Sequence, residues 1–167
     1  YWRDNVDPYI ENSTGWKVWR REKGVSHNWS PETTFKYMLV QRRFIKPGKD
    51  QDIYHFMQRA KKVYEKHNYT GIEGVFRVIS GGNTNEYIIC TGFNEYGVGG
   101  EFLDTDKNLE ELYNEMFGWE SYRKDARLYN EALEMYSRTT ERYHFNEKLS
   151  TSSVSYTHLR AHETLPY

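Results

Sequence analysis

Five side chains on predicted strands have the chemistry that small-molecule binding or turnover needs: Tyr37, Arg43, Tyr87, Cys90 and His144. A neutral imidazole can act as a base or a ligand, an arginine can orient an anionic or carbonyl oxygen, and a tyrosine can shuttle a proton. We therefore predict that these residues line a ligand cavity. We expect neither a metal nor an organic cofactor, because no two histidines before residue 154 have the spacing of a metal-binding pair.

The same residues also have ordinary structural interpretations. His144 alternates along its strand with Arg142 and Asn146, a pattern that fits a solvent-facing strand edge equally well. Cys90 follows Ile88 and Ile89, which favours a buried small hydrophobic residue over a nucleophile. Two functions stay open: a non-catalytic dimerisation or ligand-binding module, which we favour, and a cofactor-independent small-molecule enzyme, monooxygenase- or isomerase-like, that uses the cavity.

Charge and hydropathy exclude several partners. The formal net charge is -1 and the chain has 23 basic and 24 acidic residues. It therefore lacks the excess of positive charge with which proteins bind the phosphate backbone of nucleic acids. We therefore expect no nucleic-acid partner. Apolar runs such as residues 37–40 and 87–90 are far too short to span a bilayer, so we expect a soluble chain without a membrane partner.

The spacing of apolar and turn-forming residues predicts the order β-α-β-β-α-β. The predicted strands are residues 35–44, 75–80, 86–93 and 139–145, and the predicted helices are 50–67 and 106–136. The first helix has apolar residues at i, i+3, i+4 and i+7, and we place its N-cap at Asp50. We place the second N-cap at Asp106 and expect Gly118 to bend or break that helix. The fold class is α+β, with a ferredoxin-like four-stranded antiparallel sheet.

The first predicted strand runs directly into Lys46-Pro47-Gly48-Lys49 and then into an amphipathic helix. This opening resembles that of the ferredoxin-like dimeric α/β-barrel superfamily, which includes the NIPSNAP-like and the antibiotic-biosynthesis-monooxygenase-like proteins. As an order of elements, the resemblance covers roughly residues 35–147. It implies that two sheets pack into a barrel with small ligands between sheet and helices, and it does not by itself assign a reaction.

Residues 1–30 resemble part of the later pattern. A predicted helix there is followed by Thr14-Gly15 and a strand, and the helix 50–67 is likewise followed by Thr70-Gly71 and a strand. One interpretation is a clipped α-β piece of an earlier repeat, whose sheet pairs within the chain as a pseudo-dimer. The other is a helix and an edge strand that decorate one domain. We take residues 1–30 as a partial helix-strand unit and 31–150 as the barrel domain, which forms a homodimer where no pseudo-dimer exists.

The C-terminal segment has a separate origin in our interpretation. Residues 154–164, Val-Ser-Tyr-Thr-His-Leu-Arg-Ala-His-Glu-Thr, resemble the translation of a transposase adapter used to build sequencing libraries. We therefore predict that residues 151–167 form a disordered tail, artefactual from residue 154, and we exclude it from the fold. His158 and His162 are accordingly not candidate ligands.

Overall fold

The structure, a computed structural model, describes residues 17–30, 32–94, 106–135 and 139–145. The predicted N-terminal helix and the predicted tail lie outside these residues. The elements are β1 (Val18–Arg21), β2 (Tyr37–Phe44), α2 (Asp50–Lys66), β3 (Ile72–Ser80), β4 (Glu86–Phe93), α3 (Leu109–Phe117), α4 (Ser121–Ala132) and β5 (Thr139–His144).

The strands form one antiparallel sheet in the order β1-β3-β4-β2-β5. The α+β class is confirmed, and the order of β2 to β5 is consistent with a ferredoxin-like fold. The predicted number of four strands is wrong, because β1 pairs with β3 from Val18 opposite Ser80 to Arg21 opposite Phe76. The strand that we assigned to an N-terminal unit is thus the edge strand of this sheet. The domain boundary at residue 30 stays a prediction.

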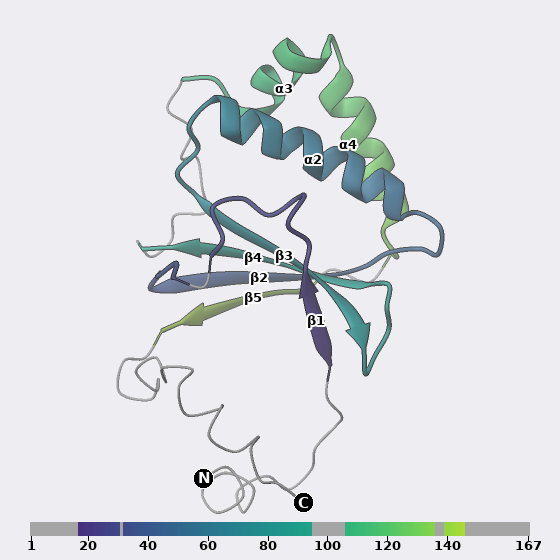
Figure 1. Ribbon diagram of the computed structural model, residues 1–167. Coiled ribbons are helices and arrows are strands. Elements are labelled where there is room, and N and C mark those ends of the chain that lie inside the picture. The colour runs from purple at the N-terminus through teal and green to yellow at the C-terminus, as the bar shows by residue number, and fades with distance from the viewer. Residues whose placement is uncertain (1–16, 31, 95–105, 136–138, 146–167) are drawn as a thin grey trace, which may run out of the picture.

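The described helices α2, α3 and α4 lie on the same face of the sheet (Figure 1). The predicted apolar face of α2 is confirmed, since Ile53, Met57, Ala60 and Val63 are buried. Ile53 and Met57 belong to a core cluster with residues of β3 and β4. The apolar periodicity of the sequence therefore positions one of the two helices between which the groove described below lies.

The helix ends differ from the predicted ones. The N-cap of α2 is Lys49 rather than Asp50, and it makes no side-chain cap. The N-cap of α3 is Asn108 rather than Asp106, because Asn108 and Glu111 form a reciprocal capping box that satisfies two backbone donors. The predicted break at Gly118 is confirmed, and its φ of 102° is one that a residue without Cβ adopts without strain.

Aromatic rings pack on the opposite face of the sheet, where two glycines leave room for them. A Cβ at Gly74 would lie 2.5 Å from the Trp29 ring and 2.8 Å from the Phe76 ring. A Cβ at Gly92 would lie 2.6 Å from the Phe35 ring. Trp29 contacts both phenylalanine rings, so the segment before β2 is held against the sheet by aromatic packing.

We predict that Gly74→Ala destabilises the protein by about 1–3 kcal/mol, because the new methyl group must displace two packed rings. Gly24→Ala is the matched control, since a Cβ there meets nothing within 4 Å, and its effect should stay within about 0.5 kcal/mol. Urea unfolding followed by circular dichroism measures both. Equal stabilities for the two variants would contradict the packing described.

Candidate ligand-binding groove

The structure brings together two of the five predicted site residues at one end of the sheet. Tyr37 on β2 lies opposite His144 on β5, and their rings stack with centroids 4.9 Å apart. Tyr37 also stacks on Phe93, with centroids 5.8 Å apart. These residues, with Arg142 and Tyr143, line a hollow of about 190 Å³. A role of this hollow in ligand binding stays a prediction.

Arg43 and Tyr87 are cross-strand partners on β2 and β4. Arg43 is six residues from Tyr37 along β2, so the two are about 20 Å apart at 3.4 Å per residue. Its Nη1 donates to the carbonyl oxygens of Arg42 (2.9 Å) and Thr139 (3.3 Å). This second pair is therefore separate from the hollow at His144.

Cys90 lies on the other face of the sheet. It is opposite Gly74 and Val40, and it alternates with Ile89, which belongs to the core cluster beneath the helices. Burial raises the pKa of its thiol to about 11, so the unreactive thiol form prevails near neutral pH. The five predicted residues thus occupy three places rather than one cavity.

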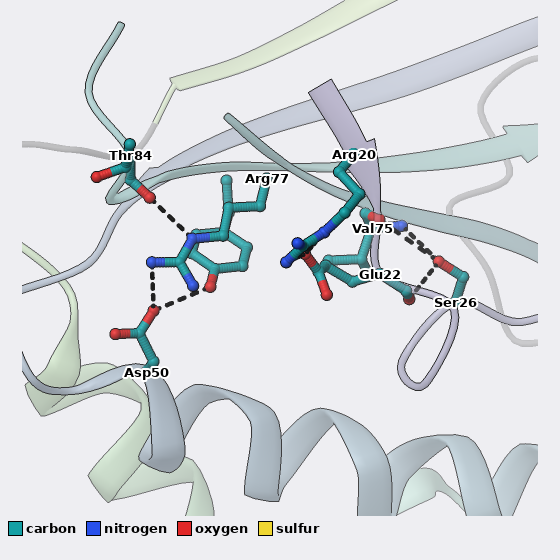
Figure 2. A network of polar contacts seen from close by, with 8 residues as sticks. Arg20, Glu22, Ser26, Asp50, Val75, Arg77 and Thr84 are labelled. Atoms are coloured by element: carbon teal, nitrogen blue, oxygen red, sulfur yellow. Dashed lines mark hydrogen bonds and ion pairs between the residues drawn. The ribbon is translucent and has the colours of Figure 1, made fainter. Parts of the chain in front are cut away.

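Asp50, Arg77 and Thr84 form a polar network at the start of α2 (Figure 2), and Tyr87 belongs to it. Its hydroxyl donates to Asp50 Oδ1 (2.9 Å), which also receives Arg77 Nη2 (3.2 Å). Arg77 Nε donates to the Thr84 carbonyl (2.9 Å). Burial, together with hydrogen bonds to Tyr54 and Asp50, raises the pKa of Tyr87, so this hydroxyl stays protonated as a donor. The network holds the first turn of α2 against β3 and β4.

A neighbouring set of contacts fixes the turn after β1. Arg20 Nε and Nη2 donate to Glu22 Oε1 at 3.1 and 2.9 Å. Ser26 Oγ donates to the Glu22 carbonyl (2.9 Å) and accepts from the Val75 amide (3.0 Å), as Figure 2 shows. These groups satisfy one another, which indicates a structural role.

A large hollow lies on the helical side, between α2 and α4. It has a volume of about 1030 Å³. It is lined by Gln51, Asp52, His55, Arg59, Phe117, Trp119, Glu120, Ser121, Arg123, Lys124, Asp125, Arg127 and Leu128. We call it the helical groove.

A buried carboxylate forms the floor of the helical groove. Asp125 Oδ2 accepts hydrogen bonds from Arg59 Nη1 (2.7 Å) and the Tyr113 hydroxyl (2.8 Å), and His55 Nε2 lies 3.4 Å away. We call these residues the Asp125 cluster. His55 and Arg59 are four residues apart on α2 and so share one helical face, while Tyr113 comes from α3. The cluster therefore joins all three described helices.

The cluster is buried at its centre and accessible at its edge. The Asp125 side chain is 5% exposed, whereas those of Arg59 and His55 are 31% and 48% exposed. A buried carboxylate needs charged and hydrogen-bonding partners, and Arg59 and Tyr113 supply them. Burial, with Asp125 as the next cause, raises the pKa of Tyr113, so it remains a donor. The Phe117 ring lies 4.7 Å from the Arg59 guanidinium and holds it further.

The arrangement leaves specific groups available to a ligand. His55 Nε2 lies 3.4 Å from Asp125 Oδ2, and a neutral imidazole offers one donor and one acceptor nitrogen. Within the described residues, no partner of Arg59 Nε is seen, and one nitrogen, Nη1, bonds Asp125. The groove thus presents an acceptor and guanidinium donors side by side, a combination suited to binding a polar small molecule or to moving a proton.

Sequence reasoning missed this site because its residues are remote in the chain. Arg59 and Asp125 are 66 residues apart, and His55 lies off the apolar stripe of α2, so no apolar pattern marks it. One signal was present: an imidazole and a guanidinium at i and i+4 on the same helical face.

Comparisons with protein-family models, with curated proteins and with solved structures find no match for this chain. Among the described residues, no helix is both long and apolar enough to cross a membrane. The same residues contain no group of three or more His, Cys, Asp or Glu side chains placed to hold a metal ion.

A second cluster of ionisable groups lies where β3 meets the segment after β1. His27 and Glu73 are bridged through their backbones, and His27 Nε2–H donates to the Tyr69 carbonyl (2.8 Å). The His27 ring also contacts Tyr64 and Tyr69. Glu73 keeps some exposed surface, yet desolvation raises the pKa of its carboxyl to about 7. Folding therefore favours the protonated form of Glu73.

This raised pKa predicts a pH-dependent stability. The stabilisation from a protonated Glu73 is fully present below the ordinary pKa of 4.5 and is lost as the pH rises through about 7. Glu73→Gln removes this titration and leaves His27, Tyr64 and Tyr69 in place. We expect the Glu73→Gln variant to have a higher melting temperature than wild type at pH 8, with little difference at pH 4.5. A constant difference across this range would contradict the assignment.

Proposed function

We propose that this protein is a ligand-binding module of ferredoxin-like fold that takes a small molecule into the helical groove. The observation that carries the proposal is the Asp125 cluster. It places His55 and Arg59, both partly exposed, in the lining of the helical groove. Ligand sites are typically hollows with a few well-placed polar groups.

Two features of the groove support binding rather than a merely structural gap. Its volume of about 1030 Å³ lies just above the range of about 300–1,000 Å³ found for small-molecule sites. Apart from Glu120, its polar groups lie on α2 and α4 rather than on loops, and helices hold side chains in place more firmly. The ligand would therefore meet a largely preformed site.

A second candidate function, a cofactor-independent enzyme, is favoured by one contact. Asp125 lies 3.4 Å from His55 Nε2, and a carboxylate that orients an imidazole is the usual arrangement of a general base. In this alternative, Nδ1 of His55 takes a proton from the bound molecule and the Arg59 guanidinium stabilises the negative charge that develops. The two functions share one site and differ in whether the ligand is changed.

The proposed dimerisation involves the other side of the sheet. The described helices cover a single face (Figure 1), and the opposite face carries partly exposed apolar residues such as Met38, Val40 and Ile88. A second copy, or an earlier repeat within a longer chain, is the partner that we propose for this face. Such an interface leaves the helical groove on the outside of the assembly.

We expect small polar compounds to perturb amide signals of α2 and α4 in ¹H–¹⁵N spectra of the full chain. Gln51→Trp should abolish these shifts because a bulky indole enters the groove from an exposed position, whereas Lys62→Trp, exposed on α2 but outside the groove, should not. His55→Gln separates the two functions, since its amide keeps a hydrogen-bonding group in the groove and should weaken binding only modestly, whereas it should abolish any turnover. Shifts confined to the surroundings of Tyr37 and His144 would contradict the proposal.

A further inference from the structure

The rim of the helical groove carries a nearly free indole. Trp119 is 88% exposed, the highest value among the exposed large hydrophobic residues of the described chain. It lies between Gly118, with a φ of 102°, and Glu120, with a φ of 58°. This turn between α3 and α4 directs the indole away from the packed helices, so packing does not account for a tryptophan here. An exposed aromatic at the edge of a polar hollow points to a stacking partner.

We propose that the ligand of the groove is a small organic anion with a planar ring, its anionic group at Arg59 and Lys124 and its ring on Trp119. This inference rests on the proposed function and names the ligand class for the same site. It assigns to Trp119 the role of a stacking platform. Each end of the ligand is matched by its own set of side chains.

We place the anionic group of the ligand by asking which charged side chains of the groove already have a partner of opposite charge. Arg123 Nε bonds Glu110 (2.9 Å), Arg127 Nε is 3.8 Å from Glu131, and Asp52 is bonded by Lys49 (3.2 Å). Asp125 is neutralised by its bond from Arg59. Among the charges of the groove that the structure describes, two then remain without a compensating partner. Lys124 has no side-chain partner within the described residues, and Glu120 lies at the rim.

Arg59 can receive an anion without leaving Asp125. Its Nη1 is the nitrogen that bonds the carboxylate, and a guanidinium has further N–H donors arranged in a planar fork that matches carboxylate or phosphate oxygens. The Phe117 ring keeps the guanidinium plane in position. His55, four residues earlier on α2, adds a group that can donate or accept beside it.

The ring end follows from the position of Trp119 relative to Asp125. Along α4, Asp125 is four residues beyond Ser121, which corresponds to about 6 Å at 1.5 Å per residue. Trp119 precedes that helix and lines both the helical groove and an adjoining hollow of about 220 Å³. Because the indole, Arg59 and Lys124 line the same hollow, a ligand with an anionic group and a ring can contact all three.

Phenyl phosphate is the probe. Benzyl alcohol, which lacks the anionic group, and inorganic phosphate, which lacks the ring, are the comparators. Isothermal titration calorimetry of the full chain should give phenyl phosphate an affinity at least about tenfold higher than either comparator. This is expected when ring stacking and the charged contact both contribute to binding. Trp119→Ala should lower the phenyl phosphate affinity about tenfold without changing the melting temperature. Met135→Ala, which removes another strongly exposed apolar side chain outside the groove, should change neither.

The charged contact has its own variants. Lys124→Ala should weaken phenyl phosphate and leave benzyl alcohol unaffected, whereas Lys62→Ala, an exposed lysine on α2 outside the groove, should alter neither. If benzyl alcohol binds the groove as tightly as phenyl phosphate, or Trp119→Ala has no effect, the ligand class is wrong while the proposed function stands. If no compound perturbs the amides of the groove, both are overturned.

Discussion

The helical layer depends on one buried charge. Asp125 is almost fully removed from solvent, and a carboxylate in that position is tolerated only when hydrogen bonds and an opposite charge replace its water. Arg59 from α2 and Tyr113 from α3 meet this requirement, so the helices must approach one another in an arrangement that brings both donors to one oxygen. Nonpolar packing alone does not impose that arrangement, because it is not directional.

The apolar clusters explain why this charge lies at the rim of a groove rather than in the centre of the core. Ile53 and Met57 of α2 pack toward the sheet, while Val63 packs with Leu112 and Tyr113 of α3. The side of α2 that bears His55 and Arg59 faces α4 instead. The polar contact therefore closes the bottom of the space between α2 and α4 and leaves its upper part open to a ligand.

Much of the fold was predictable because it depends on local patterns. The apolar spacing of residues 50–67 indicates a helix with one buried face, the break at Gly118 follows from glycine, and the loop 81–85 connects two β-rich runs. The predicted N-cap was one residue away from the observed one at α2 and two residues away at α3. At α3, Asn108 takes this position instead of Asp106 because it forms a reciprocal capping box with Glu111. The sequence left β1 open between a piece of an earlier repeat and an edge strand of one domain, because β1 is only four residues long and its partner β3 lies far along the chain.

The candidate site was less predictable for a physical reason. Side chains on strands can be assigned to a face from their alternation, but the alternation does not say which hollow forms, and the five chosen residues fall in three places. The Asp125 cluster requires α2, α3 and α4 to be placed relative to one another. No local pattern at Asp125 distinguishes it from an exposed aspartate on a charged helix.

A double-mutant cycle between Arg59 and Asp125 tests the central claim most directly. Arg59→Gln, Asp125→Asn and the double variant are compared by urea unfolding, with the exposed pair of Arg123 and Glu110 as a control cycle. A shared buried contact that organises the helices predicts a coupling free energy of about 2 kcal/mol or more, against less than about 1 kcal/mol for the exposed pair. A coupling below about 0.5 kcal/mol between Arg59 and Asp125 would contradict the account.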